Sequence, residues 1–242
     1  MVAKYLAPQF IAGSIVMRIV ITAGGTREYV DPVRFISNAS TGKMGYALAH
    51  AALKRGHKVT LITTVDRASC IVNRVTSHES RATIVNVETA AEMFKAVKKH
   101  FPKCDCLIMA AAVADYTPAQ RAKTKIRREN RPITIKLIPT PDILKWAGEH
   151  KNESRATSHE SRIVVGFALE GENLRANAEK KLREKNLDMI IANATTAIGA
   201  DKVALQIKMP QRKWLKLAKA SKTVVARKII SLVEADKNES HN

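Results

Sequence analysis

The 242-residue chain has few cysteines and few acidic residues, and each shortage excludes a class of protein. Its three cysteines are too few for the disulfide framework of a small secreted domain. Cys104 and Cys106 alternate in an apolar run, so we expect both on one face of a buried strand. With no matching Cys or His pair elsewhere, reduced core thiols are predicted rather than a zinc site. No apolar run is long enough to span a membrane, and we expect a cytoplasmic protein.

Acidic residues number only 22 against 41 lysines and arginines, which gives a net charge of +19. Such an excess is typical of nucleic-acid-binding proteins, because lysine and arginine displace counterions from phosphates. The basic residues are, however, spread along the whole chain, and aromatic residues make up only 5%. No stacking surface or RNA-recognition signature is present, so nucleic acid is not the expected partner. Small polyanionic substrates would explain the charge equally well.

Short apolar runs alternate with segments of helical periodicity along most of the chain. This alternation predicts a Rossmann-like α/β fold, a mainly parallel sheet with helices on both faces. Two further segments, 125–138 and 202–218, have the pattern of hairpins and should add a small antiparallel element. We expect strands at 18–25, 57–64, 82–87, 104–113, 162–169 and 187–193, and helices at 45–56, 89–100, 141–150, 173–186 and 221–234.

A single domain is expected over residues 17–236. Residues 1–16 are interpreted as a disordered extension, with Met17 as a plausible start, and residues 237–242 as a tail. Two short sequences occur twice, TSHESR at 76–81 and 157–162 and KNES at 151–154 and 237–240. Their flanks share no periodicity, so we interpret the copies as insertions tolerated in surface loops. His78 and His159 are then solvated residues and not metal ligands.

The segment DPVRFISNASTGKMG, residues 31–45, follows the first predicted strand and leads into a helix expected to begin near Thr41. Gly24 and Gly25 would form the turn that precedes it. A helix start after a β-strand offers free N–H groups to a phosphate. The segment does not match a Walker A loop, a G-x-G-x-x-G fingerprint or a Tyr-x-x-x-Lys pair. A helix simply capped by Ser or Thr is the alternative.

Other polar residues follow later predicted strands or lie on one helix face. Asp115 ends the run of small residues AAAVAD, at a strand end where a ribose or base could be recognised, although an Asp there is also common in turns. Phe167 should reach the carboxyl edge of the sheet. Lys181 and Lys185 are four residues apart and so share a helix face. Lysines that converge on one mouth are unfavourable without an anion.

Taken together and in this order, these segments resemble phosphopantothenate–cysteine ligase, the C-terminal half of a bifunctional coenzyme A biosynthesis flavoprotein in many bacteria. The resemblance extends over about residues 17–235. It rests on the segments ITAGGTRE, DPVRFISNASTGKMGYALA, AAAVADY, KIRR, PDIL, VGFALE and KNLDMIIAN.

The resemblance implies a two-step reaction in a dimeric, cytoplasmic enzyme that uses Mg²⁺ or Mn²⁺. The carboxylate of phosphopantothenate attacks the α-phosphate of CTP and releases pyrophosphate. The amine of L-cysteine then attacks the acyl-cytidylate to give phosphopantothenoylcysteine and CMP. Because no flavin-binding half is recognised in this chain, the resemblance implies no FMN and a separate decarboxylase as pathway partner.

Site residues also follow from the resemblance. Arg34, Asn38 and Lys125 fall on catalytic positions, and Arg34, Asn38 and Ala112 on substrate-binding positions. Asn38 would meet the charge that develops on the acyl oxygen. No metal ligands are implied. The nucleotide-binding positions are Gly24, Gly25, Ala110, Ala111, Asp115, Lys125, Pro141, Asp142, Ile143, Leu144, Phe167, Lys181 and Lys185.

The sequence departs from the family pattern at two places that border the predicted site. Thr140 stands where the family usually has Asn, and Glu170 is followed by Gly171 in place of Thr. CTP is expected on the resemblance, with ATP as the open alternative. A Rossmann-type NAD(P) oxidoreductase and a non-catalytic nucleic-acid-binding protein are the other hypotheses. The missing fingerprint argues against the first, and the presence of Arg34, Asn38 and Lys125 argues against the second.

Overall fold

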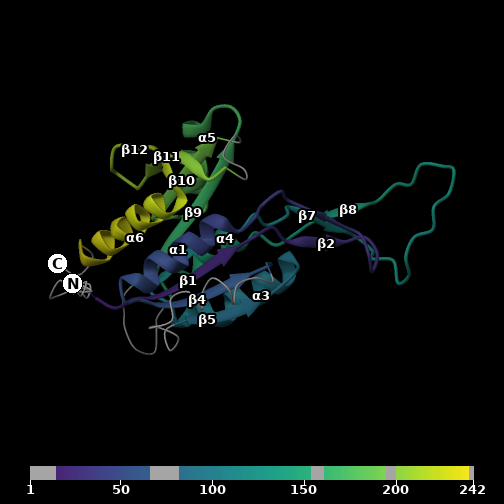
Figure 1. Cartoon of the computed structure of the whole chain (residues 1–242), viewed down its shortest axis with the longest axis horizontal. Coiled ribbons are helices and arrows are strands. Elements are labelled where there is room, and N and C mark those ends of the chain that lie inside the picture. Colours follow the sequence, from purple (N-terminus) through teal and green to yellow (C-terminus); the bar gives the residue numbers. More distant parts are fainter. Residues whose placement is uncertain (1–14, 66–81, 154–160, 195–199, 240–242) are drawn as a thin grey trace, which may run out of the picture.

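An eight-stranded sheet organises the computed structural model, which describes residues 15–65, 82–153, 161–194 and 200–239 (Figure 1). Its strands run in the order β12-β11-β10-β9-β6-β1-β4-β5. The bounds are β1 Arg18–Ala23, β4 Lys58–Thr63, β5 Ala82–Asn86, β6 Cys106–Met109, β9 Ile163–Glu170, β10 Met189–Ala194, β11 Lys202–Lys208 and β12 Leu215–Ser221.

The six neighbouring strands β5, β4, β1, β6, β9 and β10 of this sheet are parallel. Strands β11 and β12 add an antiparallel hairpin at one edge. Counted in chain order, the parallel strands follow the 3-2-1-4-5-6 arrangement of a doubly wound sheet. The order reverses between β1 and β6. Ligands of such sheets bind at the carboxyl ends of the strands beside this reversal. The predicted Rossmann-like fold is confirmed.

Helices cover both faces of the sheet, because β1, β4, β6, β9 and β10 contribute buried apolar residues to both sides. Helices α1 (Lys43–Lys54) and α6 (Lys222–Glu239) lie side by side on one face (Figure 1). The other face is covered by α3 (Ala90–His100), α4 (Ile143–His150) and α5 (Leu174–Glu184), with a short 3₁₀ helix at Phe101–Lys103. Among the described residues, no helix combines the length and apolarity that crossing a membrane requires.

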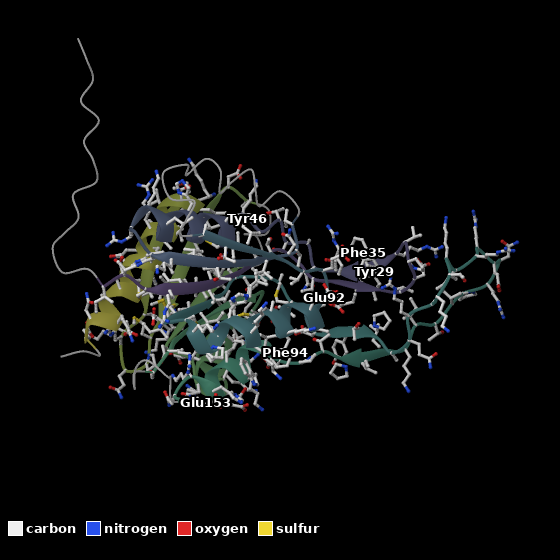
Figure 2. All side chains as sticks on the ribbon, turned by 90° about the horizontal axis from the view of Figure 1, so that it is seen from below. Tyr29, Phe35, Tyr46, Glu92, Phe94 and Glu153 are labelled. Carbon is white, nitrogen blue, oxygen red and sulfur yellow. The ribbon has the colours of Figure 1, made fainter. Side chains whose placement is uncertain are left out.

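Two small antiparallel sheets project from the carboxyl edge of the main sheet (Figure 1). One pairs β2 (Arg27–Tyr29) with β3 (Phe35–Ser37), and the other pairs β7 (Tyr116–Pro118) with β8 (Leu137–Pro139). We call residues 27–37 and 116–139 the arm. Figure 2 shows Tyr29 and Phe35 together on it, with ring centroids 5.6 Å apart.

The two predicted hairpins differ from expectation. The segment 125–138 does not pair with itself, since only its last residues enter β8, whose partner is β7. Pro132 interrupts the segment and has no N–H to donate to a ladder. The segment 202–218 does form a hairpin, but β11 pairs with β10 and so continues the main sheet. Helix α6 ends at Glu239, five residues beyond the expected 234, and includes the first residues of the predicted tail.

The two cysteines of the predicted strand face opposite sides of the sheet, so that expectation was wrong. Cys106 lies in β6 and packs under α1 and α6, whereas Cys104 precedes the strand and packs with the residues under α3 and α4. Both are buried and form no disulfide. Cys70 lies outside the described residues. The strand begins two residues later than predicted, because the 3₁₀ helix carries the chain as far as Lys103.

The repeated sequences are not wholly solvated insertions. Arg162, in one TSHESR copy, is buried and its guanidinium donates to the carbonyl oxygens of Phe101, Pro102 and Glu153. Lys151, in one KNES copy, is buried and its Nζ lies 2.6 Å from Asp188 Oδ1. These residues stabilise the amino-terminal edge of the sheet. His78 and His159 lie outside the described residues.

Gly45 sets the distance between α1 and β1. A Cβ there would lie 2.5 Å from Ala23 Cβ and 2.8 Å from Thr22 O. Gly45→Ala should therefore lower the free energy of unfolding by about 1–3 kcal/mol, as overpacking typically does. Urea denaturation would measure the change.

Gly171→Ala is the matched control, because no atom lies within 4 Å of the added Cβ and the backbone needs no positive φ. Its stability should equal that of the wild type or exceed it by up to about 1 kcal/mol. Equal stability of both variants would contradict the proposed close packing of α1 on β1.

Candidate functional site

A cavity of about 690 Å³ opens at the carboxyl ends of β6, β9 and β10, beside the reversal in strand order. This volume is within the usual range for a site that binds a small molecule. Its wall combines the loop before α1, the turn after β6, the start of α4, the end of α5 and the start of α6. The lining residues are Asn38–Met44, Met109–Val113, Asp115, Thr140–Leu144, Phe167–Glu170, Lys181, Lys185, Asn193 and Lys222.

Most residues of the predicted site line this one cavity, although they come from distant parts of the chain. They are Asn38, Ala110, Ala111, Ala112, Asp115, Pro141, Asp142, Ile143, Leu144, Phe167, Lys181 and Lys185. The remaining four predicted residues do not line it. Gly24 and Gly25 lie in the turn after β1, and Arg34 and Lys125 lie on the arm.

Gly24 and Gly25 allow two backbone segments to approach closely. Gly24 has a φ of +90°, and a Cβ there would lie 2.1 Å from Thr64 Oγ1. A Cβ on Gly25 would lie 2.6 Å from Asn38 O. The turn pairs with the segment after β6, since Ala112 N donates to Gly24 O at 2.8 Å and Gly25 bridges Ala112. Neither glycine lines the cavity, but the close approach that both allow fixes the positions of Asn38 and Ala112, which do line it.

The Asn38 side chain is held by the same pairing. Its Nδ2 donates to Ala112 O at 3.2 Å and to Val113 O at 3.1 Å. Both amide hydrogens are therefore used, and the atom left for a ligand is Oδ1, a hydrogen-bond acceptor. The donation to an acyl oxygen that we expected from the sequence would require one of these hydrogen bonds to exchange.

Helix α1 begins at the cavity without a side-chain cap. Its N-cap residue, Gly42, is in the left-handed conformation with a φ of +72°, and no hydroxyl accepts from the first turn. The alternative of a simple Ser- or Thr-capped helix is therefore wrong. The helix begins at Lys43, two residues after Thr41, near which its start was expected. An uncapped N-terminus directed at a cavity leaves N–H donors for an anion.

Lys181 and Lys185 lie at the end of α5 and line the cavity together. Lys181 Nζ donates to Phe167 O at 3.0 Å, and Lys185 Nζ lies 2.7 Å from Asp142 Oδ2. Burial lowers the pKa of Lys181, and the charge of Lys185 lowers it further, against the opposing effect of Glu170, Asp142 and Asp115. Burial raises the pKa of Asp142, but hydrogen bonds from Lys185 and the Lys145 amide outweigh it, so this pKa lies below the ordinary value.

On the arm, Asp31 joins Arg34 to the backbone of Ile126, the residue that follows Lys125. The buried carboxylate of Asp31 accepts from the amides of Val33, Arg34 and Ile126, and Arg34 Nη2 donates to Ile126 O at 2.6 Å. Burial raises the pKa of Asp31, but these backbone hydrogen bonds lower it by more. The pKa of Asp31 therefore lies below its ordinary value, and the carboxylate stays ionised at lower pH than a free aspartate. These hydrogen bonds hold the segment that carries exposed Lys125 against the β2–β3 turn.

Several cavity residues were not predicted from the sequence. Thr140 donates through Oγ1 to Ala114 O at 2.5 Å and so joins the turn after β6 to the start of α4. Lys43 belongs to the segment 31–45, but no ligand contact was predicted for it. Lys222, Glu170 and Asn193 also line the cavity. Nothing local in the sequence distinguishes Lys222 from many surface lysines, because its place follows from the packing of α6 beside α1.

Residues 15–236 match the family described as the C-terminal domain of the DNA/pantothenate metabolism flavoprotein. The chain belongs to this family. The coenzyme A biosynthesis bifunctional protein CoaBC of Bacillus subtilis (strain 168) is 43% identical over 185 residues, which are 75% of this chain and 41% of that protein. CoaBC of Borreliella burgdorferi is 36% identical over 219 residues, 89% of this chain and 52% of that protein.

The crystal structure of the C-terminal domain of a coenzyme A biosynthesis bifunctional protein CoaBC has the same fold. It superposes with a TM-score of 0.72 at 36% identity, over 92% of this chain and 96% of that chain. The chain thus spans about half the length of the CoaBC proteins that it matches. Family membership confirms the resemblance found in the sequence and argues against the oxidoreductase and nucleic-acid-binding hypotheses.

The lowered pKa of Lys181 predicts how nucleotide binding depends on pH. A bound phosphate stabilises the ammonium, so affinity should fall as pH rises through the pKa of unliganded Lys181, which lies below its ordinary 10.5. Lys181→Met should weaken the binding of CTP, the nucleotide expected from the sequence resemblance, about tenfold or more. It should also flatten the dependence on pH as the pH approaches 10.5 from below.

Isothermal titration calorimetry across this pH range would measure the effect. Lys180→Met is the control, because Lys180 is the exposed neighbour on α5 and pairs with Glu184 outside the cavity. An unchanged pH profile in Lys181→Met would show that this ammonium does not contact the nucleotide.

Proposed function

We propose that the chain is a CTP-dependent phosphopantothenate–cysteine ligase acting in cytoplasmic coenzyme A biosynthesis. The observation that carries the proposal is the convergence of Asn38, Asp115, Phe167 and the Lys181–Lys185 pair on one cavity of nucleotide size. The family membership and the coenzyme A biosynthesis names of the relatives support the same reaction.

In the first step, a carboxylate oxygen of phosphopantothenate attacks the α-phosphorus of CTP. An acyl–oxygen–phosphorus bond forms, the bond to the β-phosphate breaks, and pyrophosphate leaves. The protein contributes mainly position and positive charge, as is usual in such transfers. Lys181 and Lys185 supply charge at one end of the cavity, and Phe167 and Asp115 border the same end.

In the second step, the amine of L-cysteine attacks the acyl carbon. A C–N bond forms, the bond between the acyl carbon and the phosphate oxygen of CMP breaks, and the proton that the amine loses passes to solvent water. Asn38 serves this step in its present geometry by accepting an N–H hydrogen bond from the amine at Oδ1, because both of its own hydrogens are bound to Ala112 and Val113. This role orients the amine and requires no rearrangement of the turn.

Mg²⁺ or Mn²⁺ enters the reaction bound to the phosphates of CTP. Among the described residues, no group of three His, Cys, Asp or Glu side chains could hold a metal by itself. Mg²⁺ commonly binds one or two carboxylates together with substrate phosphates, and the cavity fits that mode. Asp115 and Glu170 line the cavity, and neither forms an ion pair with a lysine of the described residues, as Asp142 does with Lys185. The ion would neutralise phosphate charge as pyrophosphate departs.

The decisive experiment measures pyrophosphate release by the purified chain with phosphopantothenate and Mg²⁺, comparing CTP with ATP, with and without L-cysteine. We expect turnover with CTP, and formation of phosphopantothenoylcysteine only when L-cysteine is present. Asn38→Ala should lower the amide-forming rate by about 100-fold, because the attacking amine loses the acceptor that orients it. A folded wild-type chain that releases no pyrophosphate with either nucleotide would overturn the proposal, and a preference for ATP would correct the nucleotide.

We also propose that the enzyme is a homodimer in which the arm of one subunit completes the cavity of the other. Exposed large apolar side chains are concentrated on the arm, which carries eight of the thirteen found among the described residues. They are Val33, Phe35, Ile36, Tyr116, Ile133, Ile135, Leu137 and Ile138. Arg34 is expected at the substrate, yet it does not line the cavity of its own chain. A second copy that covers the apolar arm would supply it.

Subunit complementation tests this arrangement. Asn38→Asp and Arg34→Gln should each be nearly inactive alone. If the arm acts in trans, every mixed dimer has one intact site, so an equal mixture refolded together should recover about a quarter of wild-type activity.

The control is a mixture of Asn38→Asp with Asn38→Ala, which should recover nothing because no dimer then contains an intact site. Activity no higher than that of the separate variants, in dimers shown to have exchanged, would place Arg34 in the cavity of its own subunit. A monomer in analytical ultracentrifugation would contradict the dimer itself.

A further inference from the structure

The cavity has a second positively charged end, formed by Lys43 and Lys222. Lys43 is the first residue of α1, and Lys222 is the first residue of α6. These helices are far apart in the sequence but lie side by side (Figure 1). Their amino-terminal ends therefore bring two ammonium groups to the same part of the wall.

This arrangement concentrates positive charge where it is electrostatically unfavourable. The amino-terminal end of a helix carries a partial positive charge, so acidic and not basic residues stabilise it. Neither α1 nor α6 has an acidic residue in its first turn. Asp201 offsets the charge only in part, because its Oδ1 lies 2.8 Å from Lys43 Nζ while its side chain is 84% exposed.

The ammonium of Lys222 differs from those of the other cavity lysines in having no hydrogen bond or ion pair with any described residue, although the Lys222 backbone N donates to Asp201 O. Lys181 donates to Phe167 O, Lys185 pairs with Asp142, and Lys43 pairs with Asp201. Burial lowers the pKa of Lys222, and the charge of Lys43 lowers it further, with Asp201 opposing. An ammonium held at a cavity wall without a partner is compensated when an anion binds there.

We propose that Lys43 and Lys222 hold the β- and γ-phosphates of the nucleotide and then the pyrophosphate that leaves. The inference rests on the proposed function and assigns this part of the cavity within it. In a doubly wound sheet, nucleotide phosphates sit at the helix start that follows the first strand, which is where Lys43 lies. The Lys181–Lys185 end then takes the α-phosphate and the nucleoside, both of which CMP also carries.

The assignment gives the two lysines a defined part in the first step. When the carboxylate oxygen attacks the α-phosphorus, the bond between this phosphorus and the bridging oxygen of the β-phosphate breaks. The electron pair stays on that oxygen, which becomes part of pyrophosphate. Two ammonium groups beside it stabilise the added negative charge, so they aid departure as well as binding.

Binding of inorganic pyrophosphate and of CMP, each measured by isothermal titration calorimetry with Mg²⁺, tests the assignment. Lys222→Met and Lys43→Met should weaken pyrophosphate binding about tenfold or more and change CMP binding less than about twofold. Lys222→Arg should retain most of the affinity, because it keeps the charge. Lys228→Met, an exposed lysine on α6 outside the cavity, should leave both ligands unaffected.

The outcomes separate this inference from the proposed ligase activity, since neither ligand requires turnover. Equal weakening of CMP and pyrophosphate, or unchanged pyrophosphate binding in a folded Lys222→Met, would overturn the assignment even if the chain is an active ligase. Absence of pyrophosphate binding by the wild type would also overturn it. Lysine-dependent pyrophosphate binding in a chain without ligase turnover would support this site and contradict the proposed reaction.

Discussion

Backbone pairing between the turn after β1 and the segment after β6 is the contact on which the rest of the site depends. Gly25 and Ala112 form a bridge there, and Ala114 N donates to the buried Thr26 Oγ1 at 2.9 Å. The same segment accepts both hydrogen bonds of the Asn38 amide. The pairing requires glycine at the turn, because a side chain on Gly25 would meet Asn38 O. The pairing therefore joins the loops that follow β1 and β6, where the strand order reverses. It also holds the Asn38 side chain and fixes the point from which the arm projects.

The electrostatics of the cavity follow from where three helices begin or end. Helices α1 and α6 begin at the wall and α5 ends there, and each brings lysine side chains to it. A cavity with this charge favours a ligand with several phosphates, which is consistent with a nucleoside triphosphate. It also explains why part of the net charge of +19 is useful for small-molecule binding. The basic residues far from the cavity have no such explanation in the structure.

The arm separates the predicted catalytic residues into two groups. Asn38 remains at the base of the arm, beside the sheet, while Arg34 is held further out by the buried carboxylate of Asp31. An exposed apolar surface on a projecting element is typical of an interface. Hydrogen bonds of Asp31 and Arg34 to Ile126 join the β2–β3 turn to the segment of Lys125. Such cross-links suit an element that must present its side chains to another molecule.

The sequence by itself determined the alternation of strands and helices and the Rossmann-like class, because buried parallel strands and amphipathic helices have local apolar patterns. It also indicated twelve of the residues that line the cavity, because the motifs that carry them are contiguous. Tertiary structure decided what has no local pattern. The side of the sheet faced by Cys104, the burial of Arg162 and the position of Lys222 depend on how distant elements pack. The hydrogen-bond state of Asn38 and the separation of Arg34 from the cavity likewise depend on pairing between strands far apart in the chain.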